Sequence, residues 1–169
     1  MSYLPSSPDL TKIAAMLGKY PRRGILLFKL LEDIKSSCSP LNRSMRELII
    51  TYTSGLNQWD FCYNTHKAVS EQLGIDEKVF DQLKADIDSA QVDERLKPVL
   101  RYIKKLTLTP DRITQADAQQ IFDAGWDENV FLDVIFLCAV VNCMNRFVSG
   151  IGIWWLNVYS RITDYLNAD

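Results

Sequence analysis

The chain has 169 residues, of which 47% are hydrophobic, 11% aromatic and 24% charged. This length and composition exclude a disordered or collagen-like chain and predict a single domain over residues 1–169 with a buried core. The formal charge of −2 disfavours nucleic acid as a partner, because binding to phosphates needs a basic face. A single histidine excludes a zinc site built from several imidazoles, and we expect no metal and no other cofactor.

Cellular location is predicted from three features. The opening residues MSYLPSSPDL lack the basic and apolar regions of a signal peptide. The longest apolar stretch, Val130 to Val141, is shorter than the roughly 20 residues that span a bilayer. Without a secretion signal, Cys38, Cys62, Cys138 and Cys143 are interpreted as reduced thiols. We therefore expect a cytoplasmic protein that does not associate with membranes.

Apolar residues recur every three or four positions along the chain, which is the period of amphipathic helices. The stretch Leu41, Met45, Leu48, Tyr52 and Leu56 is one example. Strand alternation with hairpin turn signals is absent from the sequence. The pattern predicts an all-α fold with helices near residues 8–18, 22–37, 41–57, 60–73, 76–88, 94–107, 115–124 and 128–148, and a last one near 154–167.

Helix ends carry recognisable signals. Pro21 and Pro40 suit the first turn of a helix, and Ser39 is the expected cap before Pro40. Thr114 with Asp117 forms an imperfect capping box, and Asp127 is the expected cap of the last long helix. Gly74 and Gly125 suit the left-handed position after a helix. The segment 128–147 is apolar nearly all round, which predicts the central helix of the bundle.

One pair of residues points to chemistry. Asp60 is the expected N-cap of the helix near 60–73, with Asn57 as the alternative, so that Cys62 lies in the first turn. Unpaired N–H groups and the positive end of the helix dipole favour a thiolate there. His66 follows one turn later on the same face, and a cysteine in contact with a histidine can become a nucleophile. The same spacing also fits a buried thiol and a core histidine.

Glu47 is a third candidate, as a proton relay. It lies on the preceding helix, which the short link should pack beside the Cys62 helix, so its carboxylate can reach His66. A surface position is the alternative for Glu47. Cys38, Cys138 and Cys143 are interpreted as small buried hydrophobic residues.

The chain resembles a known family in two blocks. The first is Arg46-Glu47, Cys62-x-x-x-His66 and Gly74. The second, Lys105 to Gly152, has a Gly125-Trp126 turn before a long apolar helix that ends in Asn145-Arg146, Gly150 and Gly152. Together these blocks are similar to the alkyl hydroperoxidase D-like, or carboxymuconolactone decarboxylase, family, and within it to the peroxidase-related branch. The resemblance covers roughly residues 10–155.

The resemblance implies an all-α, AhpD-like bundle around a two-helix active-site hairpin, assembled into homo-oligomers. In redox members the second cysteine of a Cys-x-x-Cys pair attacks a hydroperoxide and the first resolves the product to a disulfide. Cys62 matches the attacking cysteine, His66 the histidine and Glu47 the glutamate. Trp59 stands where the first cysteine belongs, so an external thiol or a more distant cysteine must resolve the product.

These observations lead to three hypotheses. The first is a peroxidase-related oxidoreductase that reduces small hydroperoxides with Cys62, a His66–Glu47 relay and an external thiol. The second is a non-redox, lactone decarboxylase-like lyase in which His66 and Glu47 act on a small organic acid, with Arg46 and Arg146 as candidate cations for its carboxylate. The third is an inactive binding or assembly protein, which the loss of the first cysteine favours.

Overall fold

All secondary structure in the described part of the chain is helical. The computed structural model describes residues 2–8, 13–36 and 38–152. Within them lie eight α-helices, two short 3-10 helices and no strand, which confirms the predicted all-α class. The elements are α1 (Ile13–Gly18), α2 (Pro21–Ser36), α3 (Arg43–Leu56), α4 (Asp60–Gln72), α5 (Lys78–Ala85), η1 (Ile87–Ser89), α6 (Leu96–Leu108), η2 (Pro110–Arg112), α7 (Gln115–Asp123) and α8 (Glu128–Ile151).

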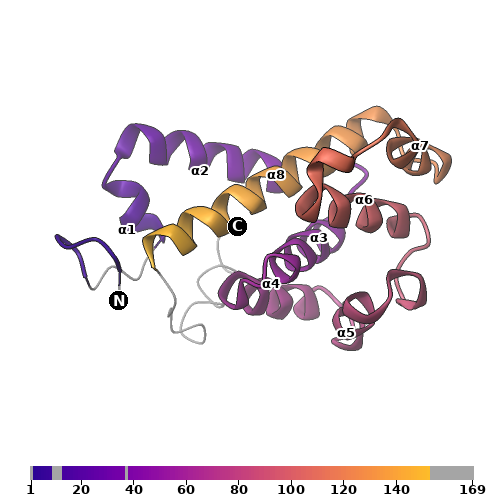
Figure 1. Ribbon diagram of the computed structural model, residues 1–169, viewed down its shortest axis with the longest axis horizontal. Helices are drawn as coiled ribbons and strands as arrows, with labels where there is room; N and C mark the ends of the chain where they lie inside the picture. The colour runs from indigo at the N-terminus through magenta and orange to yellow at the C-terminus, as the bar shows by residue number, and fades with distance from the viewer. Residues whose placement is uncertain (1, 9–12, 37, 153–169) are drawn as a thin grey trace.

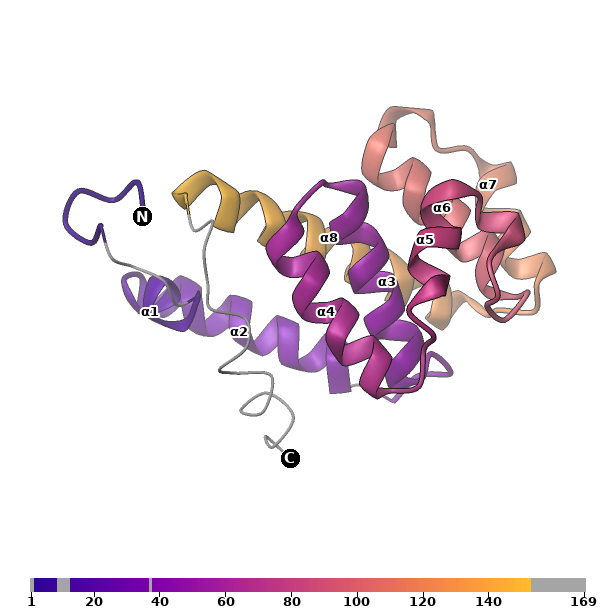
Figure 2. The same cartoon turned by 90° about the horizontal axis from the view of Figure 1, so that it is seen from below.

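The centre of the fold is a hairpin of α3 and α4. Residues 57–59 join the two helices, so they run antiparallel and pack along their lengths. The long helix α8 packs across α3, and α2 lies along α8 on one side of the molecule (Figure 1). The helices α5, α6 and α7 gather at the other end, as the turned view shows (Figure 2). The hairpin is therefore enclosed by helices from both halves of the sequence.

Several predicted helix ends are confirmed. The helix α2 begins at Pro21. Thr114 and Asp117 form a complete capping box at the start of α7, and the Asp127 side chain accepts a hydrogen bond from the Val130 N–H at the start of α8. Gly74 and Gly125 have φ angles of +89° and +88°, the left-handed backbone that favours glycine. Local capping chemistry was enough to place these ends.

Other predicted boundaries were wrong. The helix expected from residue 41 begins at Arg43, because the Asn42 side chain accepts the Met45 N–H at 2.9 Å and caps it. Pro40 and Ser39 therefore precede the helix. The helix expected over 76–88 is α5 followed by the separate turn η1, since the Asp86 side chain caps η1 instead. The predicted helix near 154–167 lies outside the described residues, as do residues 9–12 of the first one.

The most enclosed helix is α3. The helix α8, which the sequence predicted as the central one, contacts α2, α3, α6 and α7 but leaves part of its surface exposed. Every residue from Arg46 to Ser54 is buried, although this run contains five polar or charged side chains. Helix α3 tolerates them because their polar groups are paired. The Thr51 and Thr53 hydroxyls, for example, donate to the carbonyls of Glu47 and Ile49, each at 2.8 Å. By contrast, Leu132 and Phe136 on α8 are more than half exposed.

Helix α8 is long and apolar enough by composition to cross a membrane. Within its most apolar 18 residues, 44% are buried inside the fold. It contacts α2, α3, α6 and α7, which is also how the core helix of a bundle packs. Length and composition alone therefore fit both a membrane-spanning helix and the core helix of a bundle.

Candidate active site

The first turn of α4 holds the cysteine that the sequence singled out. Trp59 is the N-cap residue and its side chain makes no capping hydrogen bond, so the predicted caps Asp60 and Asn57 were wrong. Asp60 is the first residue of α4, and Asn57 caps the C-terminus of α3. The sequence was right that Cys62 lies in the first helical turn.

Cys62 is buried in an apolar cluster. Its neighbours there include Met16 and Leu17 of α1, Trp59, and Val140 and Met144 of α8. Burial raises the pKa of the Cys62 thiol to about 12, and a hydrogen bond from the Trp59 side chain lowers it by less. This is opposite to the predicted thiolate. The helix dipole contributes at most about 2 kcal/mol, and desolvation of a sulfur inside the core outweighs it.

Glu47 and His66 form a hydrogen-bonded pair across the hairpin. The His66 Nδ1 lies 2.7 Å from Glu47 Oε2, and the Glu47 side chain is only 3% exposed. Burial raises the pKa of Glu47, but the hydrogen bond and charge of His66, together with Lys35, outweigh it and lower the pKa overall. Glu47 is thus a carboxylate that only accepts hydrogen bonds, so Nδ1 must be the donor.

The orientation of His66 has a chemical consequence. With its proton on Nδ1, a neutral imidazole has a lone pair on Nε2. Within the part of the chain that the structure describes, no side chain hydrogen-bonds this second nitrogen. The ring also makes no hydrogen bond to the Cys62 sulfur there, although both residues lie on α4 one turn apart. The ring is therefore held by Glu47 through Nδ1, and a water or substrate oxygen would be needed to connect Nε2 to the sulfur.

Lys35 is a site residue that the sequence analysis missed. It comes from the last turn of α2, and its Nζ lies 3.6 Å from Glu47 Oε1. Burial lowers the pKa of Lys35, and Glu47 opposes that shift. Lys35 and His66 thus contact the two oxygens of the same carboxylate, Lys35 at Oε1 and His66 at Oε2. Nothing in the local sequence signals this contact, because it depends on how α2 packs on the hairpin.

The two arginines proposed for a substrate carboxylate have other partners. Arg46 is buried and donates to the backbone carbonyls of Leu41 at 3.0 Å and Ile34 at 2.7 Å, which joins α2 to the start of α3. Arg146 is exposed and donates to the side chain of Asn142 at 2.6 Å. Arg46 thus has a structural role.

All four cysteines are free thiols. Cys138 is buried as expected, and its sulfur contacts the Thr107 hydroxyl at 3.4 Å. Cys38 and Cys143 are exposed, so their interpretation as buried hydrophobic residues was wrong. Cys143 faces outward because α8 is not covered on all sides. Among the described residues, no three His, Cys, Asp or Glu side chains gather in a way that could hold a metal ion.

Comparisons with known proteins place the fold. No family model matches the chain. The uncharacterized protein YdfG of Bacillus subtilis (strain 168) is 23% identical over 152 residues, which cover 90% of this chain and 93% of that protein. This similarity extends over nearly the whole of both chains.

Solved structures have the same fold at low identity. An AhpD-core, peroxidase-related protein of unassigned function from Ralstonia eutropha JMP134 matches with a TM-score of 0.75 and 21% identity, over 84% of this chain and 75% of that one. A peroxidase-related protein from Silicibacter sp. TM1040 matches with a TM-score of 0.72 and 22% identity, over 86% of this chain and 78% of that one. The debrominase Bmp8, as a cysteine-to-alanine variant in complex with 2,3,4-tribromopyrrole, matches with a TM-score of 0.73 and 10% identity, over 89% of this chain and 79% of that one. The chain therefore has the AhpD-like fold, as expected.

Proposed function

We propose that this protein is an AhpD-like, peroxidase-related oxidoreductase that reduces small hydroperoxides with Cys62 as its single reacting thiol. The observation that carries the proposal is the Glu47–His66 hydrogen bond of 2.7 Å, which orients a base one helical turn after Cys62. The peroxidase-related names of two proteins that share the fold support the same chemistry.

The reaction proceeds in three balanced steps. The Cys62 sulfur attacks the distal oxygen of a hydroperoxide ROOH, the O–O bond breaks, and the thiol proton goes to the departing oxygen, which gives a sulfenic acid and ROH. An external thiol then attacks the sulfenic sulfur and releases water, leaving a mixed disulfide. A second external thiol attacks the mixed disulfide, restores Cys62 and leaves as the external disulfide.

The buried state of Cys62 decides what His66 must do. With a pKa of about 12, only about one thiol in 100,000 is ionised at pH 7. The sulfur must therefore lose its proton as it reacts, and we assign that proton transfer to Nε2 of His66, one helical turn after Cys62. Glu47 stabilises the imidazolium that forms, from the other side of the ring.

Peroxide consumption by the full chain with dithiothreitol as reductant tests the proposal. Cys62→Ser should lose all consumption above the uncatalysed rate in buffer, whereas Cys143→Ser, which removes an exposed thiol, should keep the parental rate. Glu47→Gln should reduce the rate by about a hundredfold through loss of base orientation. Equal rates for the parent and Cys62→Ser would reject the proposal. A parent no faster than buffer would indicate an inactive binding or assembly protein.

A second function is favoured by one observation, the burial of Cys62 in an apolar cluster. A neutral, buried thiol leaves the Glu47–His66 pair as the ready acid–base group, which suits a lyase of the carboxymuconolactone decarboxylase type acting on a small organic acid. Activity on such an acid that survives complete alkylation of the thiols, but is lost in Glu47→Gln, would establish this function instead.

A further inference from the structure

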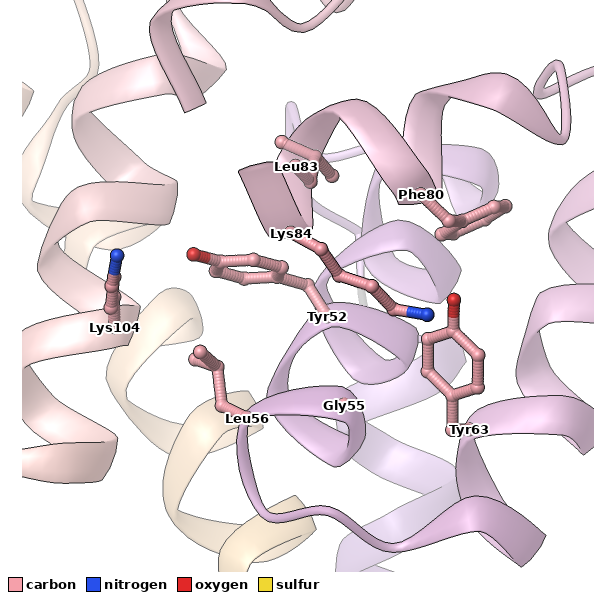
Figure 3. Close-up of a pocket in the computed structure, with 8 residues that line it drawn as sticks. All are labelled: Tyr52, Gly55, Leu56, Tyr63, Phe80, Leu83, Lys84 and Lys104. Carbon is pink, nitrogen blue, oxygen red and sulfur yellow. The ribbon is translucent and has the colours of Figure 1, made fainter. Parts of the chain in front are cut away.

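The Glu47 carboxylate has a nitrogen group beside each of its oxygens. The Lys35 Nζ lies 3.6 Å from Oε1 and the His66 Nδ1 lies 2.7 Å from Oε2, while the Glu47 side chain is only 3% exposed. In the cavity between α3, α4, α5 and α6, by contrast, Lys84 and Lys104 lie on opposite sides and their charges do not converge (Figure 3). Lys35, Glu47 and His66 are therefore close enough to share one balance of charge.

The place of Lys35 beside Glu47 is fixed by the residues next to them. Arg46 is buried and donates to the Ile34 carbonyl at 2.7 Å. These two residues directly precede Glu47 and Lys35 in the sequence. The same guanidinium donates to the Leu41 carbonyl at 3.0 Å. Because the last carbonyls of a helix have no partner within it, this contact holds the end of α2 against the start of α3 and brings Lys35 to the carboxylate.

The buried carboxylate needs a positive partner, and two groups can supply it. If the imidazole supplied it, both ring nitrogens of His66 would carry protons and no lone pair would be left to accept one. The Lys35 ammonium beside Oε1 removes that need, so the ring can stay neutral with its lone pair on Nε2. The pKa shifts agree with this pairing. Burial raises the pKa of Glu47, but His66 and Lys35 outweigh it, and burial lowers the pKa of Lys35, which Glu47 opposes.

The charges that act on this group come from three helices. His66 on α4 and Lys35 on α2 both act on Glu47 of α3. Arg43, exposed at the start of α3, also acts on Lys35 and adds to the lowering of its pKa by burial. Arg46 is engaged with the two backbone carbonyls described above. Lys35 is therefore the cation that α2 brings to the carboxylate from outside the hairpin.

We propose that Lys35 is a positioning residue of the site, which supplies the counter-charge of Glu47 and thereby leaves His66 a neutral base near pH 7. This role rests on the function proposed above, in which His66 takes the proton of Cys62. Lys35 acts through Glu47, so the proposal adds a residue of α2 to a site otherwise built on α3 and α4.

The pH dependence of the His66 ring signals in NMR spectra of the full chain tests this role. His66 is the only histidine in the chain, so its ring gives one set of signals, which shows when the Glu47–His66 pair takes up a proton. Lys35→Met removes a cation that opposes this uptake and should raise its midpoint by about one pH unit. Lys35→Arg keeps the charge, and Lys29→Met removes an exposed charge from the same helix, so each should move the midpoint by less than about 0.3.

This measurement does not depend on peroxidase activity, so the two proposals can fail separately. An unchanged midpoint in Lys35→Met, or an equal change in Lys29→Met, overturns the role of Lys35 whatever the activity. Should Lys35→Met fail to fold, as judged by circular dichroism, the neutral variant Lys35→Gln takes its place and the same midpoint decides.

The peroxide assay gives a second readout. Lys35→Met should lose at least about threefold more rate near pH 6 than near pH 8, because the pair holds the additional proton only at the lower pH. A loss that is equal at every pH would indicate that Lys35 only supports the fold, and would overturn the proposal. A parent without peroxidase activity would reject the function proposed above and leave the midpoint to decide the role of Lys35.

Discussion

Cys62, the residue on which the proposed peroxidase chemistry depends, is subject to two opposing effects. Its place in the first turn of α4 favours the thiolate, and its burial among α1 and α8 favours the thiol. Burial prevails and the pKa rises to about 12. A peroxidase built on this sulfur must therefore remove the proton during attack, which gives His66 a more demanding role than it would have beside a preformed thiolate.

We predict that Cys62 reacts slowly with iodoacetamide at neutral pH. Because its pKa is raised, the thiolate fraction and hence the rate should increase about tenfold per pH unit up to the highest pH at which the protein stays folded. Cys38 and Cys143 are exposed and should react first. Mass spectrometry of each cysteine peptide provides the readout. A Cys62 rate that levels off near pH 7 would contradict the raised pKa.

Contacts within the hairpin were more predictable than contacts from outside it. The Glu47–His66 approach follows from helical period and a short link, both of which are local in sequence. The Lys35–Glu47 contact and the raised pKa of Cys62 depend on where α2, α1 and α8 pack. Neither spacing nor composition encodes that packing directly. The sequence therefore identified three of the candidate site residues but missed Lys35 and the raised pKa of the Cys62 thiol.

Among the elements, the short helix α1 controls how well Cys62 is covered. It packs on α2 so closely that a Cβ atom on Gly24 would lie 2.4 Å from the Leu17 carbonyl oxygen and 2.8 Å from its carbon. Backbone cannot move aside as a flexible side chain can. Gly24 therefore sets the distance at which α1, with Met16 and Leu17, covers the Cys62 cluster.

Gly24→Ala should displace α1 and uncover the sulfur. We expect a loss of about 1–3 kcal/mol in unfolding free energy from overpacking, measured by urea denaturation, and faster alkylation of Cys62 at a fixed pH. Gly18→Ala is the matched control, because a Cβ atom there meets nothing within 4 Å. Equal alkylation rates in the parent and Gly24→Ala would show that α1 does not cover the thiol.

Helix ends were predictable where a side chain caps its own backbone, as at Thr114 and Asp127. The burial of whole helices was not. The apolar composition of α8 predicted a central helix, yet the most enclosed helix is α3, whose buried threonines hydrogen-bond within the helix. The amphipathic pattern of a helix shows which of its faces is apolar, whereas the number of helices that pack around it depends on the whole fold.

At the scale of the molecule, the excess apolar surface lies largely on two neighbouring helices. On α2, Ile25, Leu26 and Phe28 are 56%, 64% and 50% exposed. On α8, Leu132 and Phe136 are 51% and 54% exposed. Both helices lie along the same side of the ribbon (Figure 1). Large exposed apolar residues gathered on one helix, as on α2, are typical of interfaces between chains.

We predict that α2 joins two copies of this chain. A double change, Leu26→Glu with Phe28→Glu, should shift the mass measured by sedimentation equilibrium from an oligomer to one chain, because each copy would place buried carboxylates against the other. Leu108→Glu, which changes another exposed leucine, at the end of α6, should leave the oligomer intact. A parent protein that sediments as a single chain at about 0.1 mM would contradict this interface, since an obligate dimer binds more tightly than that.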